Sequence, residues 1–168
     1  MDARLIVALS IVGVVVVYAV LSQYWTSRST QWYASLPRPG WQPPDLVFAL
    51  IWPLNFLLLA VSGWVMGYTQ PRVASITFGV TLTGSVVFAL SWAYLFYVPH
   101  RLGLATASLT TAAVLAWGLV SVAWVTVVWA GVMVLPYALW MTVASALSLS
   151  YARTVPEEMR QHRRARVR

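Results

Sequence analysis

Aromatic residues are the groups in this sequence whose number and spacing point to chemistry, because the usual catalytic groups are scarce. The chain has ten Trp and eight Tyr but no Cys, which excludes thiolate metal sites and Cys nucleophiles. Its four acidic residues lie outside the long apolar segments or at the start of one, and its two His residues are far apart in sequence. We therefore expect no metal site and no pair of His and carboxylate for acid–base catalysis. The chemistry left is the stacking of a ligand on aromatic rings.

One aromatic set is regularly spaced. Phe48, Trp52 and Phe56 recur every four residues, which places them on one face of a helix. Lipid contact or ordinary packing is the alternative for each single Trp. The set predicts an aromatic wall for a large, flat, apolar ligand. Five Trp residues fall on apolar segments: Trp52, Trp64, Trp92, Trp117 and Trp140.

The elements that carry these residues are membrane helices. The chain is 60% hydrophobic and 9% charged, against about 25% charged in soluble domains. A spanning helix needs about 20 apolar residues, and residues 102–152 contain no charge, so this stretch must hold two helices with a turn near residues 124–131. We predict an all-α membrane protein, a bundle of five transmembrane helices. Their expected positions are residues 5–24, 46–68, 73–97, 103–123 and 130–152.

The first apolar segment has a competing interpretation as a secretory signal peptide. Its apolar run exceeds the 7–15 residues of a typical signal core, and no clear cleavage site follows. We expect it to remain as a helix.

The basic residues are all Arg and gather at the C-terminus. We expect one transmembrane domain, residues 1–153, followed by a basic cytoplasmic tail, residues 154–168, that is attracted to anionic lipid. Nucleic acid is not an expected partner, since no basic residue lies on the long segments. Nine Arg on one side against two on the other place the N-terminus outside, and Arg without Lys points to a bacterial membrane. The six arginines near the C-terminus are Arg153, Arg160, Arg163, Arg164, Arg166 and Arg168.

The first connection, residues 26–45, is long and rich in Pro and Trp. It contains four Pro within residues 37–44, and long irregular loops tend to be functional. Asp45 after Pro44 is expected to cap the second helix. An interfacial anchor explains the aromatic residues but not the prolines, whereas a stiff lid over one end of the bundle explains both.

Small residues recur at four-residue spacing on three helices. This spacing lets helices approach closely, either within the chain or in a homodimer. The sets are Gly63 and Gly67; Ser85, Ala89 and Ala93; and Ala144, Ser148 and Ala152.

Two separated motifs stand out in the sequence. The first motif is Trp32-Tyr33-x-x-Leu36-x-x-Pro39-x-Trp41-x-Pro43-Pro44-x-x-Val47-Phe48-x-x-x-Trp52. The second motif, in the last span, is Ala130-Gly131-x-x-x-x-Pro136-Tyr137-x-x-Trp140. Both resemble motifs of the translocator protein family, also called tryptophan-rich sensory proteins. The similarity covers nearly the whole chain, from about residue 5 to residue 153.

The resemblance implies a function. Proteins of this family bind porphyrins, haem-type tetrapyrroles, sterols and benzodiazepine-like ligands beneath the first loop, and many are dimeric. It implies no required cofactor, with a porphyrin or haem-type tetrapyrrole as ligand. Trp52 and Trp140 match residues implicated in light-dependent porphyrin breakdown. The implied ligand-binding residues are Tyr33, Trp41, Pro43, Phe48, Trp52, Phe56, Ala89, Trp92, Pro136, Trp140 and Ala144.

Three departures from the family pattern imply a more apolar pocket. Ala89 stands nearest to a usual Asn in the third helix, Ser148 replaces another Asn, and Phe56 replaces a Tyr. Three functions remain open: a receptor or carrier for a flat hydrophobic ligand, which we favour; a light-dependent porphyrin-degrading enzyme; and a structural or partner-binding membrane protein.

Overall fold

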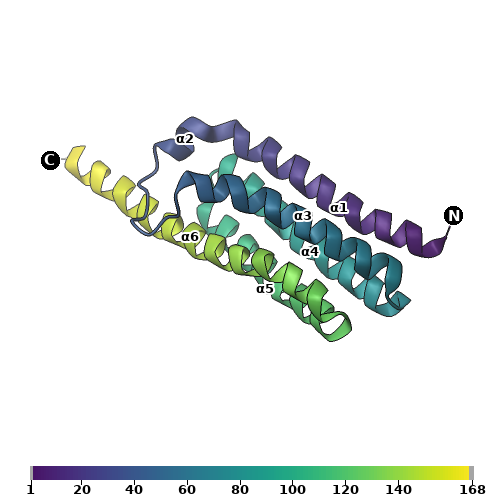
Figure 1. Cartoon of the computed structure of the whole chain (residues 1–168). Coiled ribbons are helices and arrows are strands. Elements are labelled where there is room, and N and C mark those ends of the chain that lie inside the picture. The colour runs from purple at the N-terminus through teal and green to yellow at the C-terminus, as the bar shows by residue number, and fades with distance from the viewer. Residues whose placement is uncertain (1, 167–168) are drawn as a thin grey trace.

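The computed structural model of the chain describes residues 2–166, and for residues 29, 30 and 155–166 it describes the backbone alone. Within this range the chain is almost entirely helical (Figure 1) and contains no strand. The elements are α1 (Ala3–Thr26), the 3-10 turn η1 (Ser27–Ser29), α2 (Thr30–Ala34), α3 (Asp45–Thr69), α4 (Arg72–Tyr97), α5 (Leu102–Thr126) and α6 (Val128–Arg166).

Five of these helices are long and apolar enough to cross a membrane: α1, α3, α4, α5 and the Val128–Thr154 part of α6. A helix satisfies its backbone hydrogen bonds internally, which the bilayer core requires. The described residues therefore confirm the predicted all-α bundle of five transmembrane helices.

The last helix differs from the expectation that it ends at residue 152. α6 continues as one helix to Arg166, so the start of the basic segment is not the end of the helix. Glu157, Glu158 and Met159 follow the span, and these residue types favour helix. The charges that end the apolar run thus do not end the helix. The side chains of the basic segment lie outside the described ones.

The first connection is more regular than expected. Residues 27–34 form η1 and α2, and only residues 35–44 lack helix. The expected capping role of Asp45 is wrong. Asp45 is itself the first residue of α3, Pro44 occupies the cap position, and no side chain caps this helix end. Because Pro44 has no N–H and a fixed φ, it suits the entry to a helix, and the Asp45 carboxylate is left to face Arg38.

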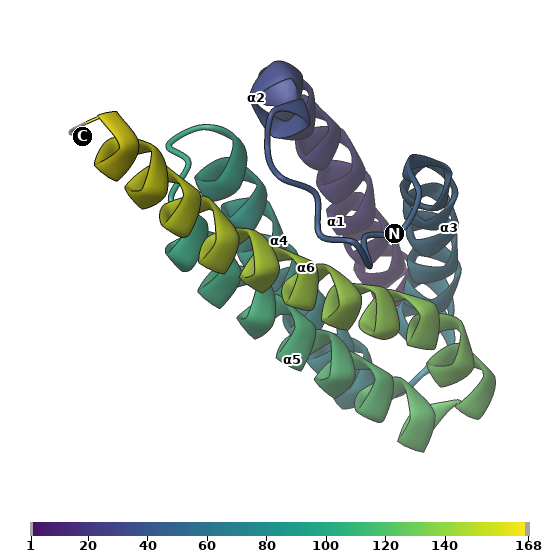
Figure 2. The same ribbon diagram turned by 90° about the vertical axis from the view of Figure 1, so that its left-hand side faces the viewer.

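The five long helices form a closed ring in the order α1, α4, α5, α6, α3 and back to α1. α5 and α6 pack as an antiparallel pair along their length (Figure 2). The first connection and the protruding end of α6 lie at one end of the bundle, which we call the lid end, and the N-terminus lies at the other (Figure 1).

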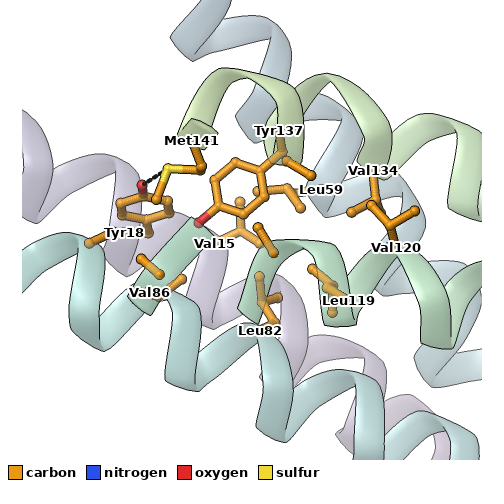
Figure 3. Packing of buried hydrophobic residues seen from close by; sticks show 14 of the residues in the cluster. Val15, Tyr18, Leu59, Leu82, Val86, Leu119, Val120, Val134, Tyr137 and Met141 are labelled. Carbon is orange, nitrogen blue, oxygen red and sulfur yellow. Dashed lines mark hydrogen bonds between the residues drawn. The ribbon is translucent and has the colours of Figure 1, made fainter. Parts of the chain in front are cut away.

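The centre of the ring is packed with apolar side chains from all five long helices (Figure 3). Two buried tyrosines have polar partners there, as buried hydroxyls require. Tyr18 donates to Met141 Sδ at 3.9 Å. Tyr137 lies 2.9 Å from Ser85 Oγ, and Ser85 donates to the Ala112 carbonyl at 2.9 Å. These bonds tie α1, α4, α5 and α6 together through the core.

Away from the lid end, small residues let the helices touch. A Cβ added to Gly67 would lie 2.6 Å from Ala8 Cα, and one added to Gly63 would lie 2.6 Å from Ile11 Cγ2. These two glycines therefore serve packing of α3 on α1 within the chain, which was one of the two alternatives. Similarly, a Cβ on Gly131 would lie 2.8 Å from Trp124 Cα, so the one-residue turn at Val127 depends on it. The second small-residue set, Ser85, Ala89 and Ala93 on α4, is also buried, but it lies nearer the lid end.

Candidate ligand-binding cavity

A cavity of about 390 Å³ lies at the lid end of the ring. Its size falls at the lower end of the roughly 300–1,000 Å³ typical of small-molecule sites. Among the described residues, α1, α2, α3, α4 and α6 contribute to its wall, and α5 does not. α5 is instead closely packed between α4 and α6.

Aromatic rings form one side of the cavity. Trp52 and Phe56 stack with centroids 5.6 Å apart and planes 29° apart. Trp140 of α6 meets Phe48 edge-to-face at 5.0 Å and Trp52 at 6.5 Å. The i, i+4 spacing on α3 aligns its three rings, and α6 brings the fourth across from them. Such a set presents ring faces and edges in several directions, which suits stacking of a flat ligand.

Hydrogen bonds satisfy some polar groups of the wall. The Trp92 indole N–H donates to Ser148 Oγ at 3.2 Å, and Ser148 lies 2.9 Å from Thr106 Oγ1. The serine that replaces a family Asn is therefore already engaged with α4 and α5. This network holds Trp92 in place at the wall, and it leaves the interior of the cavity largely apolar.

Two buried polar side chains have no partner among the described residues. They are the indole N–H of Trp140 and both amide atoms of Asn55. Trp140 lines the cavity, and its exposed fraction is 7%. Asn55 is fully buried and lies outside the cavity wall, three residues beyond Trp52 on α3. An unpaired buried amide costs about 1–3 kcal/mol, so the helix positions around the cavity are not optimised for stability alone.

The first connection packs across the lid end of α4, α5 and α6. The Trp32 ring lies 3.8 Å from the ring of His100, centroid to centroid, and 5.5 Å from Phe96. His100 adopts a positive φ of 54°, which is uncommon for a residue other than Gly. Leu36 is buried in the same apolar cluster. These contacts fix the connection on the bundle end.

The side-chain amide of Gln42 fastens the first connection to α6. Gln42 donates from Nε2 to the Tyr33 hydroxyl at 3.3 Å, and its Oε1 accepts from the Tyr151 hydroxyl at 2.5 Å. Tyr33 and Tyr151 both line the cavity. Gln42 therefore joins α2 to α6 over the cavity, and we refer to this pair of hydrogen bonds as the Gln42 clasp.

The wall is open on the side of α1 and α3. Its exposed members, Gln23, Asp45, Ala49 and Pro53, all belong to these two helices. The Arg38 guanidinium lies at this rim, with Nη1 3.4 Å from both carboxylate oxygens of Asp45. Apart from the tyrosines, Asp45 is the one ionisable residue of the described wall.

The structure brings most of the predicted site residues together, although their binding of a ligand stays a prediction. Three do not line the cavity: Trp41, which is 51% exposed, and Pro43 and Pro136. Eight of the eleven predicted residues lie on the wall: Tyr33, Phe48, Trp52, Phe56, Ala89, Trp92, Trp140 and Ala144.

The contribution of α1 to the cavity wall was not predicted from the sequence. Tyr18, Ser22 and Thr26 line the cavity together with Ala19 and Gln23. Tyr18, Ser22 and Thr26 recur every four residues in an otherwise Val-rich helix. This polar stripe is the signal that indicates a face turned away from lipid. Among the residues that the structure describes, no three His, Cys, Asp or Glu side chains lie together as a metal-binding group would.

Comparison with known proteins shows which family this sequence matches. The sequence model of the TspO/MBR family matches residues 10–153. Protein CrtK of Rhodobacter capsulatus is 30% identical over 135 residues, covering 76% of this chain and 80% of the relative. The tryptophan-rich sensory protein of Cereibacter sphaeroides is 25% identical over 137 residues, covering 75% of this chain and 78% of the relative. The translocator protein of Bos taurus is 25% identical over 138 residues, covering 76% of each chain.

Proposed function

The chain belongs to the TspO/MBR family, and from that premise we propose that it binds a flat hydrophobic ligand, a porphyrin or related tetrapyrrole, in the cavity beneath the first connection. It is an integral multi-pass membrane protein. In this proposal the bundle acts as a receptor or carrier, and its output is sensing, sequestration or transport of the ligand.

The aromatic side of the cavity is the observation that supports this ligand class most directly. Four rings from α3 and α6, on Phe48, Trp52, Phe56 and Trp140, lie within contact of one another around one space. A conjugated planar ligand gains dispersion and ring–ring interactions there that a flexible chain does not. The cavity is open on the side of α1 and α3, so an edge of the macrocycle could project there.

We also propose how the protein is oriented in the membrane. With the lid end on the side that collects most Arg residues, the positive-inside rule places the first connection and the C-terminus in the cytoplasm. The N-terminus then lies outside the cell. The membrane in this proposal is a bacterial one. The ligand would thus be exchanged at the cytoplasmic half of the bilayer.

A second function deserves a test because of one contact. Trp52 and Trp140 lie 6.5 Å apart on the same cavity wall, so a bound porphyrin would lie against both indoles. A light-excited porphyrin can take one electron from a neighbouring indole, which oxidises the indole and reduces the porphyrin. Opening of the macrocycle would then need dioxygen as the oxidant, and such a light-dependent porphyrin-degrading activity would depend on these two residues.

The test is a titration of the purified protein in dodecyl maltoside with protoporphyrin IX, followed by quenching of Trp fluorescence. We expect saturable quenching, with a weaker affinity for protoporphyrin IX in Trp52→Phe and in Trp140→Phe than in the unchanged protein. Trp64→Phe is the matched control, because Trp64 lies outside the cavity wall and stacks on Tyr68. Quenching that is linear and equal in all variants would mean partitioning into detergent and would overturn the proposal. Illumination of the same samples then tests for porphyrin breakdown.

A further inference from the structure

The charge distribution around the cavity narrows the class of ligand further, on the premise of the proposed function. Among the described residues of the wall, Asp45 is the one charged group, and it lies at the exposed rim. No Arg side chain reaches the described wall. A carboxylate carried into this interior would lose its hydration without gaining a cation, which is strongly unfavourable. An anionic ligand must therefore keep its acid groups at the rim.

Arg38 is a cation at the rim, and its ion pair with Asp45 is loose. Its Nη1 lies 3.4 Å from each oxygen of Asp45, and the side chains of Arg38 and Asp45 are 50% and 72% exposed. Strong charged N–H···O bonds measure about 2.7–2.9 Å, and exposed pairs contribute only about 0–1 kcal/mol. One nitrogen faces Asp45, so the rest of the guanidinium remains available to a second carboxylate.

Restraints on the backbone hold Arg38 in position more firmly than the ion pair of its side chain does. Arg38 lies between Pro37 and Pro39, which restrict its backbone. Leu36 is buried in the lid-end cluster on one side, and the Gln42 clasp fastens the chain on the other. The guanidinium is thus presented at the rim from a braced segment.

We infer that Arg38 is the carboxylate-recognition residue of this cavity, so that the protein selects a flat ligand with an acid group at its edge. The acid group pairs with Arg38 at the rim while the rings stack on the aromatic wall inside. Asp45 has a double effect: it orients the guanidinium, but its own negative charge opposes the incoming acid. The two residues therefore act on an anionic ligand with opposite sign.

Two matched probes separate recognition of the carboxylate by Arg38 from the affinity of the cavity for the ring system. Protoporphyrin IX carries two carboxylates, and its dimethyl ester has the same ring system without them. We expect Arg38→Gln to weaken binding of the diacid about fivefold, and Asp45→Asn to strengthen it about twofold, as for an exposed ion pair partly covered by the ligand. The affinity for the ester should not change in either variant. Each affinity is measured by fluorescence titration in the same neutral detergent.

The matched control is Arg28→Gln. Arg28 belongs to the same connection but stacks on the Tyr24 ring at 4.3 Å, outside the cavity wall. If Arg28→Gln weakens diacid binding as much as Arg38→Gln, or if Arg38→Gln weakens diacid and ester equally, the assignment of Arg38 is overturned while the cavity stands. If neither probe binds saturably to any protein, the proposed function fails and the inference fails with it.

Discussion

The half of the bundle away from the lid end and the half beneath it use opposite kinds of side chain at their helix contacts. In the first half, Gly63 and Gly67 allow α3 to touch α1, and Gly131 allows α6 to turn tightly from α5. In the second half, Trp52, Phe56 and other rings stand between the helices. Small residues permit close packing between membrane helices, whereas rings hold helices apart and leave a cavity.

One set of continuous helices is thus closely packed at one end and open at the other. α1 and α3 belong to both halves. Their contact at Gly67 fixes their spacing there, and the rings of Tyr18, Trp52 and Phe56 occupy their seam at the other end. The packed half therefore acts as a base that supports the wall of the cavity.

The largest expected effect comes from disturbing the base. Gly67→Ala would place a Cβ 2.6 Å from the backbone of Ala8, which cannot move without shifting α1. We expect the free energy of unfolding to fall by about 3 kcal/mol, the upper part of the range for overpacked sites. Thermal unfolding in dodecyl maltoside measures this change.

Gly13→Ala is the matched control for that substitution. Gly13 lies on α1, and no atom lies within 4 Å of a Cβ added there. Its replacement should leave stability equal or slightly higher, since Ala favours helix over Gly. Equal losses in the two variants would contradict the description of the base as a close backbone contact.

A smaller effect is expected at the lid end, from the Gln42 clasp. Gln42→Leu removes two hydrogen bonds, to Tyr33 and from Tyr151, which together contribute about 2 kcal/mol. The loss should be local, because the packed half does not depend on it. Hydrogen exchange of the amides in residues 35–44 should become faster, while that of α5 is unchanged.

Gln70→Leu serves as control for the clasp, since the Gln70 amide donates only to its neighbour Thr69, at 2.6 Å. Exchange at residues 35–44 that is equally slow in Gln42→Leu and in the control would show that ring contacts alone hold the connection.

The smallest expected effect is a gain in stability, and it comes from a residue that lies between the two halves. Asn55→Leu replaces a fully buried amide that has no partner among the described residues. Removing an unpaired buried polar group should raise the free energy of unfolding by about 1 kcal/mol. A loss of stability in thermal unfolding would mean that Asn55 contributes an interaction that this packing does not contain.

The spans themselves were predictable because the bilayer imposes them. Stretches free of charge gave the five long helices, and the turn between the last two was expected near residues 124–131, where Val127 separates α5 from α6. The aromatic stripe of α3 was predictable for the same reason, since its spacing fixes one helix face. These features follow from the local sequence and from the number of residues that a helix needs to cross the bilayer.

Features that depend on partners far along the chain were not predictable. The sequence contains Gly63 and Gly67 but does not show that their partner is α1 and not a second protomer. It does not show that Trp41 is exposed while Trp140 is buried. The regular structure in residues 27–34 was also missed, because ring contacts such as Trp32 with His100 stabilise it from outside.

The central claim is that the cavity beneath the first connection is the ligand site, and one matched pair of substitutions tests it most directly. Ala144 lines the cavity, whereas Ala146, two residues away on α6, is exposed on the outer face. Ala144→Phe should fill the cavity and weaken saturable binding of protoporphyrin IX by about tenfold or more. Ala146→Phe should bind as the unchanged protein does. Equal affinity in the two variants would contradict the account, because the ligand would then bind somewhere else on the protein.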